Sequence, residues 1–267
     1  MECIINGQPT FIAIQSSINP HAHTIIFIHG AAMDHSIWTL PRRYFTRHGY
    51  NALAIDLPAH GRSEGQALTC IEAQADWLIT CLDELGLKKA TFIGHSMGSL
   101  IALDLAGRYP NRVDALALLG TAIPMPVSDT LLQAAEKNQH DAYDLINLFG
   151  HCRRSQLGGN AISGMWSIGS TVRLLERARP HVLHTDFLAC HHYHTGLEQA
   201  QRVTCPTLLI VGKQDSMTSP KAAQTLAKYI PQAQIVLVDN CGHFMLSEQP
   251  EAVLLALQTM MSKIVCT

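Results

Sequence analysis

The chain has 267 residues, of which 47% are hydrophobic and 15% charged, and its formal net charge is −2. This composition suits one large domain with a sheet buried on both faces, and it gives no electrostatic reason to expect a nucleic-acid partner. No stretch reaches the roughly 18 uninterrupted apolar residues of a membrane span, and the first residues lack the pattern of a secretory leader, so we expect a cytoplasmic protein. The 8 cysteines show no CxxC spacing, which favours reduced thiols over a disulfide framework.

The predicted elements begin with a hairpin and continue with strands separated by helix-length segments. Two alternating runs at 2–6 and 10–15 predict an antiparallel hairpin at the edge of a sheet. Apolar strand cores then recur near residues 25, 52, 91, 115, 208 and 235. Because helix-length segments lie between these strands, we expect them to be parallel. The sequence therefore predicts an α/β fold with a mostly parallel, eight-stranded sheet flanked by helices.

The stretch at 94–98 reads Gly-His-Ser-Met-Gly, between a strand-like run at 90–93 and a helix-like run at 100–109. Strand, sharp turn and helix are what a nucleophile elbow requires. Such a turn holds the serine in a strained backbone conformation with its hydroxyl lifted out of the sheet, and the glycines remove Cβ atoms that would collide. Without partners the pentapeptide is also compatible with an ordinary loop, so residues further along the chain decide its meaning.

The region at 121–202 contains no convincing strand but has helix-like stretches at 129–149 and 170–180. In the fold that the resemblance described below implies, an insertion after the sixth strand is a helical cap above the carboxyl ends of the strands, where it would cover the serine. We therefore expect a core domain formed by 1–120 and 203–267, with 121–202 as a helical cap insertion.

Two polar residues follow the last two strands. Asp215 ends the strand that begins near 208, and His243 comes after Cys241-Gly242, beyond the strand near 235. A turn or helix-cap role is the alternative for Asp215, because aspartate is frequent in such positions. Asp239 is the nearest competing carboxylate, but it is close to His243 in the sequence.

With these motifs the chain resembles the α/β-hydrolase superfamily, in its serine esterase and haloperoxidase-like branch. The likeness extends from the His-Gly pair at 29–30 to the loop of His243, and the order Ser96, Asp215, His243 is the order which that superfamily uses. The resemblance implies a catalytic triad of these three residues. It implies no metal or organic cofactor.

Each residue of the expected triad has a chemical role. A serine hydroxyl is a weak nucleophile until a base takes its proton, and the imidazole of His243 is a suitable base near neutral pH. Asp215 would hold the correct tautomer of that imidazole. The resemblance also implies an oxyanion hole, formed by the backbone N–H groups of Ala31 and Met97, which would stabilise negative charge on the attacked carbonyl oxygen.

Residues of the cap give weaker signals. Candidates for a substrate pocket are Met165, Trp166, Phe187 and Leu188, although these side chains are equally suited to pack the cap onto itself. The cap also carries a group of histidines near Asp186, namely His181, His184, His191, His192 and His194. No complete ligand set accompanies them, so we favour a solvated or locally hydrogen-bonded segment over a metal site. We expect His29, His60 and His95 to make loop hydrogen bonds.

The expected function is that of a serine hydrolase, which cleaves a carboxylic ester of a small, largely apolar substrate through an acyl-enzyme. Alternatives on the same triad are lactone, thioester, amide or carbon–carbon bond hydrolysis and perhydrolysis, and a different class is a triad-bearing receptor for a small ligand. Ser96 argues against an alkyl-enzyme route, which needs an aspartate at the elbow. The oligomeric state, monomer or homodimer, stays open.

Overall fold

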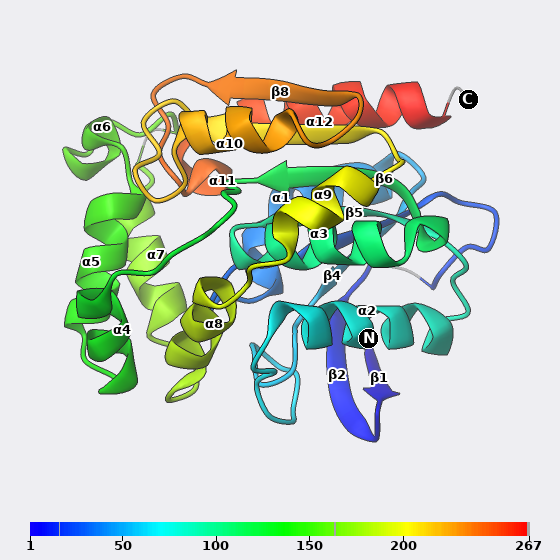
Figure 1. Ribbon diagram of the computed structural model, residues 1–267, viewed down its shortest axis with the longest axis horizontal. Coiled ribbons are helices and arrows are strands. Elements are labelled where there is room, and N and C mark those ends of the chain that lie inside the picture. Colours follow the sequence, from blue (N-terminus) through cyan, green and yellow to red (C-terminus); the bar gives the residue numbers. More distant parts are fainter. Residues whose placement is uncertain (16, 163, 266–267) are drawn as a thin grey trace.

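The computed structural model describes residues 1–15, 17–162 and 164–265, and an eight-stranded sheet forms its centre (Figure 1). The strands lie in the order β1-β2-β4-β3-β5-β6-β7-β8, with an antiparallel hairpin at one edge and parallel pairing from β4 to β8. Their bounds are β1 Glu2–Ile5, β2 Gln8–Ala13, β3 Thr24–Ile28, β4 Asn51–Ile55, β5 Ala90–His95, β6 Val113–Leu119, β7 Thr207–Gly212 and β8 Ala233–Val238. The predicted fold class is thus confirmed.

Helices cover both faces of the sheet, with α2, α3, α9 and α10 on one face and α1 and α12 on the other (Figure 1). The helix bounds are α1 Thr39–Arg47, α2 Ile71–Glu84, α3 Met97–Arg108, α4 Asp129–Glu136, α5 Asp141–Gly150, α6 Arg153–Gln156, α7 Ser167–Leu175, α8 Val182–His191, α9 Gly196–Arg202, α10 Pro220–Ala227, α11 Met245–Glu248 and α12 Pro250–Val265. Two short 3₁₀ helices are η1 His35–Trp38 and η2 Pro110–Arg112. Within the described chain, none of the helices combines the length and apolarity needed to cross a bilayer.

The central strand β3 shows why the strands are apolar throughout. Ile26 and Ile28 pack in the core on the α3 face, whereas Ile25 and Phe27 pack in the core on the α1 face. Successive side chains of a strand point to opposite faces, so a strand covered on both sides must be apolar at every position.

The segment between β6 and β7 contains helices α4 to α9, and Figure 1 shows α4 to α8 gathered beyond the carboxyl ends of the strands. The stretch predicted as one helix over 129–149 is two helices, because the chain turns at Asn138, whose φ is 51°. The helix expected at 170–180 ends at Leu175. Helix α9 packs against α3 of the core. The division into a core and a 121–202 cap remains a prediction.

Candidate active site

A sharp turn between β5 and α3 places Ser96. Its backbone has φ 54° and ψ −120°, a strained conformation for any residue with a side chain. A Cβ at Gly94 would collide with the backbone of Gly98, and a Cβ at Gly98 would collide with the carbonyl groups of Ile28 and His29. The glycines therefore permit close approach of the turn to β3, and Ser96 is partly exposed while its neighbours in the turn are buried.

Asp215 and His243 are in direct contact. The Nδ1 atom of His243 lies 2.9 Å from Oδ2 of Asp215, and both residues are buried. The same Oδ2 accepts a hydrogen bond from the Thr218 hydroxyl at 2.7 Å, while Oδ1 accepts from the N–H groups of Met217 and Thr218 at 2.9 and 2.8 Å. Because an ionised carboxylate only accepts, Nδ1 of His243 carries the proton and Nε2 of the neutral ring keeps its lone pair.

The Asp215 carboxyl is ionised at neutral pH. Burial raises its pKa, but the charge and hydrogen bond of His243 and the donors from Thr218 outweigh this effect and hold the pKa below its usual value. The competing carboxylate, Asp239, is exposed and pairs with Nζ of Lys213 at 2.6 Å. One oxygen of Asp215 also accepts hydrogen bonds from the loop backbone. Asp215 therefore has the turn role considered as an alternative and contacts His243 as well.

Ser96 and His243 approach the same end of β6. The N–H of Ser96 donates to the carbonyl of Leu119 at 2.9 Å, and a Cβ placed on the next residue, Gly120, would lie 3.0 Å from the His243 ring. Nε2 of His243 is buried and has no hydrogen-bond partner in the described parts of the chain, so the structure does not join it to Ser96. Catalytic hydrogen bonds of this kind often tighten only in substrate complexes.

The two N–H groups expected to bind an oxyanion come from a helix start and a turn. Met97 is the first residue of α3, and the first N–H groups of a helix have no acceptor within it. Ala31 follows Gly30 in the turn after β3. A Cβ placed on Gly30 would lie 3.3 Å from Cβ of Ser96, so this turn borders the serine.

The loop histidines behave as predicted. Nδ1 of His29 lies 2.9 Å from the Gly30 carbonyl, and Nε2 of His95 lies 2.9 Å from the His243 carbonyl. Burial lowers the pKa of His29 to about 4 and that of His95 to about 3. Both rings are therefore neutral at pH 7. Nδ1 of His60 lies 2.9 Å from the Pro58 carbonyl, and its Nε2 contacts Asp186 of α8 at 2.8 Å.

The segment after α5 fixes the loop that carries His243. The N–H of His243 donates to the carbonyl of Gly150 at 2.6 Å. The buried carboxylate of Glu248 accepts from the N–H of Gly242 and from that of Cys152, each at 2.9 Å. The position of His243 thus depends on chain between β6 and β7 as well as on its own loop.

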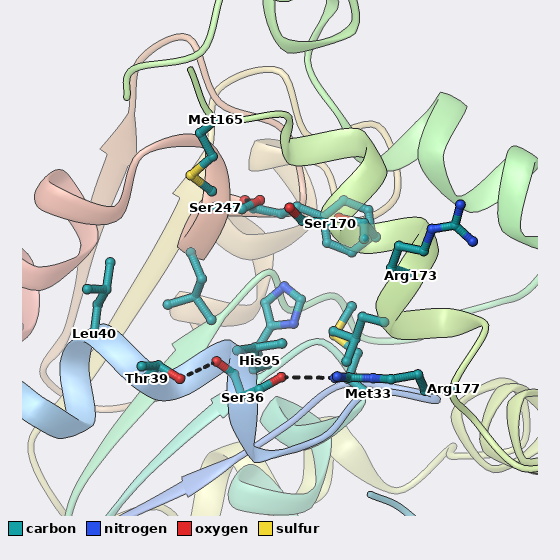
Figure 2. A pocket seen from close by; sticks show the side chains of 15 residues that line it. Met33, Ser36, Thr39, Leu40, His95, Met165, Ser170, Arg173, Arg177 and Ser247 are labelled. Carbon is teal, nitrogen blue, oxygen red and sulfur yellow. Dashed lines mark hydrogen bonds between the residues drawn. The ribbon is translucent and has the colours of Figure 1, made fainter. Parts of the chain in front are cut away.

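A cavity of about 330 Å³ lies between α7, α1 and α11 (Figure 2). Its apolar lining residues are Met33, Ile37, Leu40, Met165, Leu174, Phe244 and Leu246, and its polar ones are Ser36, Thr39, His95, Ser170, Thr171, Arg173, Arg177 and Ser247. In Figure 2, Met165 and His95 approach the cavity from opposite walls. Ser96 does not line it, although its neighbour His95 does.

The predicted pocket residues are distributed between the cavity, the surface and the core. Met165 lines the cavity. Trp166 is 69% exposed, and Phe187 is buried in the core. Trp166, Phe187 and Leu188 are not among the lining residues of this cavity.

Metal-ligating atoms gather in one place in the described chain, but not in the histidine-rich segment. Atoms of Asp34, His35 and Asp56 lie within 4.8 Å of one another. Asp56 already accepts hydrogen bonds from the N–H groups of His35 and Arg62 at 2.7 and 3.0 Å, and His35 Nδ1 lies 2.9 Å from each of its oxygens. Hydrogen bonds alone account for this cluster.

Thr218, Glu248 and Asp186 contact the candidate site but were not assigned to it from the sequence. Thr218 is only three positions after Asp215. A hydroxyl at that spacing could have indicated a hydrogen bond to the aspartate. Asp186 stands among apolar residues of α8, namely Val182, Leu183, Phe187 and Cys190. Apolar residues lie around the whole helix, so α8 has no amphipathic pattern and offers no local signal for Asp186.

Comparisons with known proteins show the family of the chain. A model of the Alpha/beta hydrolase family matches residues 25–256. The pimeloyl-[acyl-carrier protein] methyl ester esterase of Aromatoleum aromaticum is 28% identical over 249 residues, covering 85% of this chain and 93% of that protein. Esterase YbfF of Escherichia coli is 25% identical over 265 residues, covering 92% and 96%.

A solved structure shows the same fold. The enol-lactonase from Burkholderia xenovorans LB400 superimposes with a TM-score of 0.86 at 20% identity, over 98% of this chain and all of that one. The family model matches most of the chain. The chain belongs to the alpha/beta hydrolase family.

Proposed function

We propose that the protein hydrolyses carboxylic esters of small, largely apolar molecules, with Ser96 as nucleophile, His243 as base and Asp215 as the acid that orients it. The observation that carries this proposal is the buried 2.9 Å contact between Nδ1 of His243 and Asp215, which leaves Nε2 with a lone pair that can accept a proton. The esterase relatives favour an ester among the bonds that such a site can cleave.

The proposed reaction proceeds in two halves. Oγ of Ser96 attacks the carbonyl carbon of the ester while its proton passes to Nε2 of His243. The carbonyl oxygen becomes negative and accepts hydrogen bonds from the N–H groups of Ala31 and Met97. The alcohol then leaves with the proton from His243, and an acyl-enzyme remains. Water that gives a proton to His243 attacks this ester, the acid is released, and Ser96 regains its hydrogen.

The cavity indicates the kind of substrate. Seven of its lining residues carry aliphatic, aromatic or thioether side chains, so an alkyl or aryl group would be bound by burial of apolar surface. His95, the residue before Ser96 in the elbow, lines this cavity, so the cavity borders the elbow. We assign the cavity to the acyl part of the substrate.

A labelling and turnover experiment tests the proposal. A fluorophosphonate should label Ser96, and Ser96→Ala should abolish hydrolysis of p-nitrophenyl esters while the protein stays folded. Asp215→Asn should lower kcat by about 10⁴-fold, the loss seen for the corresponding change in another triad enzyme. The matched variant Asp239→Asn, at the exposed carboxylate beside Lys213, should keep the wild-type rate.

Three outcomes would contradict the proposal. They are activity retained by Ser96→Ala, a label on another residue, and an equal loss of rate in Asp215→Asn and Asp239→Asn. A panel with lactones and amides identifies the bond that is cleaved. Thermal stabilisation by a ligand without turnover of any of these compounds would instead indicate a receptor.

A further inference from the structure

The carboxylate of Asp186 connects α8 to the turn after β3. Its Oδ2 accepts a hydrogen bond from the N–H of Ala32 at 2.8 Å and lies 2.8 Å from Nε2 of His60. Asp186 is fully buried, so water does not compete for these contacts. Ala32 is 154 positions from Asp186 in the sequence, and the bond therefore exists only when α8 is seated on the core.

His60 makes this contact a buried ion pair. Its Nδ1 lies 2.9 Å from the carbonyl of Pro58, which can only accept, and its Nε2 faces the carboxylate, so both ring nitrogens carry hydrogen. Burial lowers the pKa of His60, but the charge of Asp186, the hydrogen bonds to Asp186 and Pro58 and the charge of Asp56 outweigh it, and the pKa is raised. The adjacent ring of His29, 4.8 Å away, is neutral.

The turn that Asp186 contacts also has hydrogen bonds of its own. The Gly30 carbonyl accepts hydrogen bonds from the N–H of Met33 at 3.2 Å and from Nδ1 of His29 at 2.9 Å. Ala32 has φ 54°, a left-handed conformation that an alanine keeps only when its surroundings hold it there. The bond from Asp186 to the N–H of Ala32 supplies that support.

We propose that Asp186 is a positioning residue that sets the direction of the Ala31 N–H by holding Ala32, so that seating α8 on the core completes the oxyanion hole. This inference rests on the proposed function, because the Ala31 N–H matters only to a reaction in which charge develops on an oxygen beside Ser96. Asp186 does not touch the reacting atoms. It acts through the backbone of the turn.

Two variants separate positioning from general stability. Asp186→Ala removes the acceptor, and kcat should fall about 10- to 100-fold with KM within about threefold, since complete loss of one oxyanion donor costs roughly 10²- to 10³-fold. Asp186→Asn keeps an oxygen that can accept from Ala32 and should recover most of this rate. The concentration of active sites is measured by fluorophosphonate labelling, so unfolded protein does not lower the kcat that is calculated per site.

A matched control is the buried carboxylate of Asp104 on α3, which accepts from the hydroxyl of Tyr193 at 3.0 Å and from Arg108 and does not contact the turn. Asp104→Ala should lower the Tm but leave kcat per labelled site unchanged. An equal loss of kcat in Asp104→Ala and Asp186→Ala would overturn the proposal, as would a wild-type kcat in Asp186→Ala.

A double variant provides for the case in which Asp186→Ala does not fold. Asp186→Leu combined with His60→Leu removes both charges together, and replacing a buried pair by apolar residues is often neutral for stability. Because Ala32 still loses its acceptor, kcat should be as low as expected for Asp186→Ala. A wild-type kcat in this double variant would overturn the proposal.

Amide hydrogen exchange distinguishes failure of this inference from failure of the proposed function. The Ala32 amide should exchange at least about tenfold faster in the double variant than in the wild type, because it has lost its acceptor. If the wild type hydrolyses no ester while this difference is observed, the proposed function fails and the contact between α8 and the turn stands. Equal exchange in the two proteins would overturn the positioning role whatever the activity.

Discussion

Buried histidines near the proposed active site are held in different charge states by their partners. Nε2 of His29 accepts from the N–H of Leu57 at 3.1 Å, so that ring has a donor beside it and stays neutral. His60 has an acceptor at each nitrogen, and its pKa is raised. At the scale of single residues, burial and the hydrogen-bonding character of the neighbours set the direction in which the pKa of each imidazole moves.

The neutral state of His29 predicts loss of stability in acid. Its pKa is about 4 in the folded protein, against about 6.5 for an unfolded chain. Between these values the unfolded chain binds a proton that the native ring does not, so the free energy of unfolding should decrease by about 3 kcal/mol as the pH falls through this window. Urea unfolding at about pH 7 and about pH 4.5 measures the decrease, which should be smaller in His29→Gln.

An exposed histidine at the end of α1 is the control for this measurement. His48→Gln should keep the wild-type dependence on pH, because His48 lies on the surface. Equal dependence in the wild type and His29→Gln would contradict a neutral buried ring.

The residues of the proposed site differ in how far the sequence could reveal them. Asp215 and His243 each follow a predicted strand, and strand ends are regular features of the pattern. The contact of Asp186 with Ala32 spans 154 positions and depends on how α8 docks. Local patterns carry no information on such docking, so the sequence could not predict it.

At the scale of elements, the strands were predictable because burial on both faces makes them continuous apolar runs. The helices between β6 and β7 were harder to predict. Helix α8 is rich in histidine, which suggested a solvated segment, yet Val182, Leu183 and Phe187 are buried. Its burial depends on the packing of α4 and α3 against it, which no local pattern reports.

The end of α5 carries a second prediction, because Gly150 lies directly against the His243 loop. A Cβ at Gly150 would collide with the ring of Phe244, while the Gly150 carbonyl accepts the N–H of His243. Gly150→Ala should therefore displace His243 and lower kcat by about 10- to 100-fold, since a shift of about 1 Å at a reacting group has effects of this size. Ester turnover per fluorophosphonate-labelled site measures the loss.

Gly159→Ala is the matched control within the same region. The nearest atoms to the added Cβ there belong to Arg154, mainly its flexible side chain, so kcat should stay within about twofold of wild type. A normal kcat in Gly150→Ala would show that this helix end does not position His243.

At the scale of the whole molecule, the segment between β6 and β7 contacts the loops of the proposed site at separate points. Asp186 bonds the turn after β3, Gly150 bonds the His243 loop, and Arg177 pairs with Asp34 at 2.9 Å. The sheet sets the ends of the strands, but these contacts fix the loops that follow them. The same segment forms one wall of the cavity, so substrate size and loop position depend on one part of the chain.

The cavity predicts a preference for acyl length that a single side chain should shift. Each methylene buried there should lower the activation free energy by up to about 0.8 kcal/mol, which raises kcat/KM roughly fourfold, until the space of about 330 Å³ is full. Leu174→Trp, on the α7 wall, should move the optimum of a p-nitrophenyl ester series toward shorter acyl groups. Leu157→Trp, at a position 78% exposed and outside the cavity, should leave it unchanged. If both variants kept the wild-type optimum, the acyl group would have to bind outside this cavity.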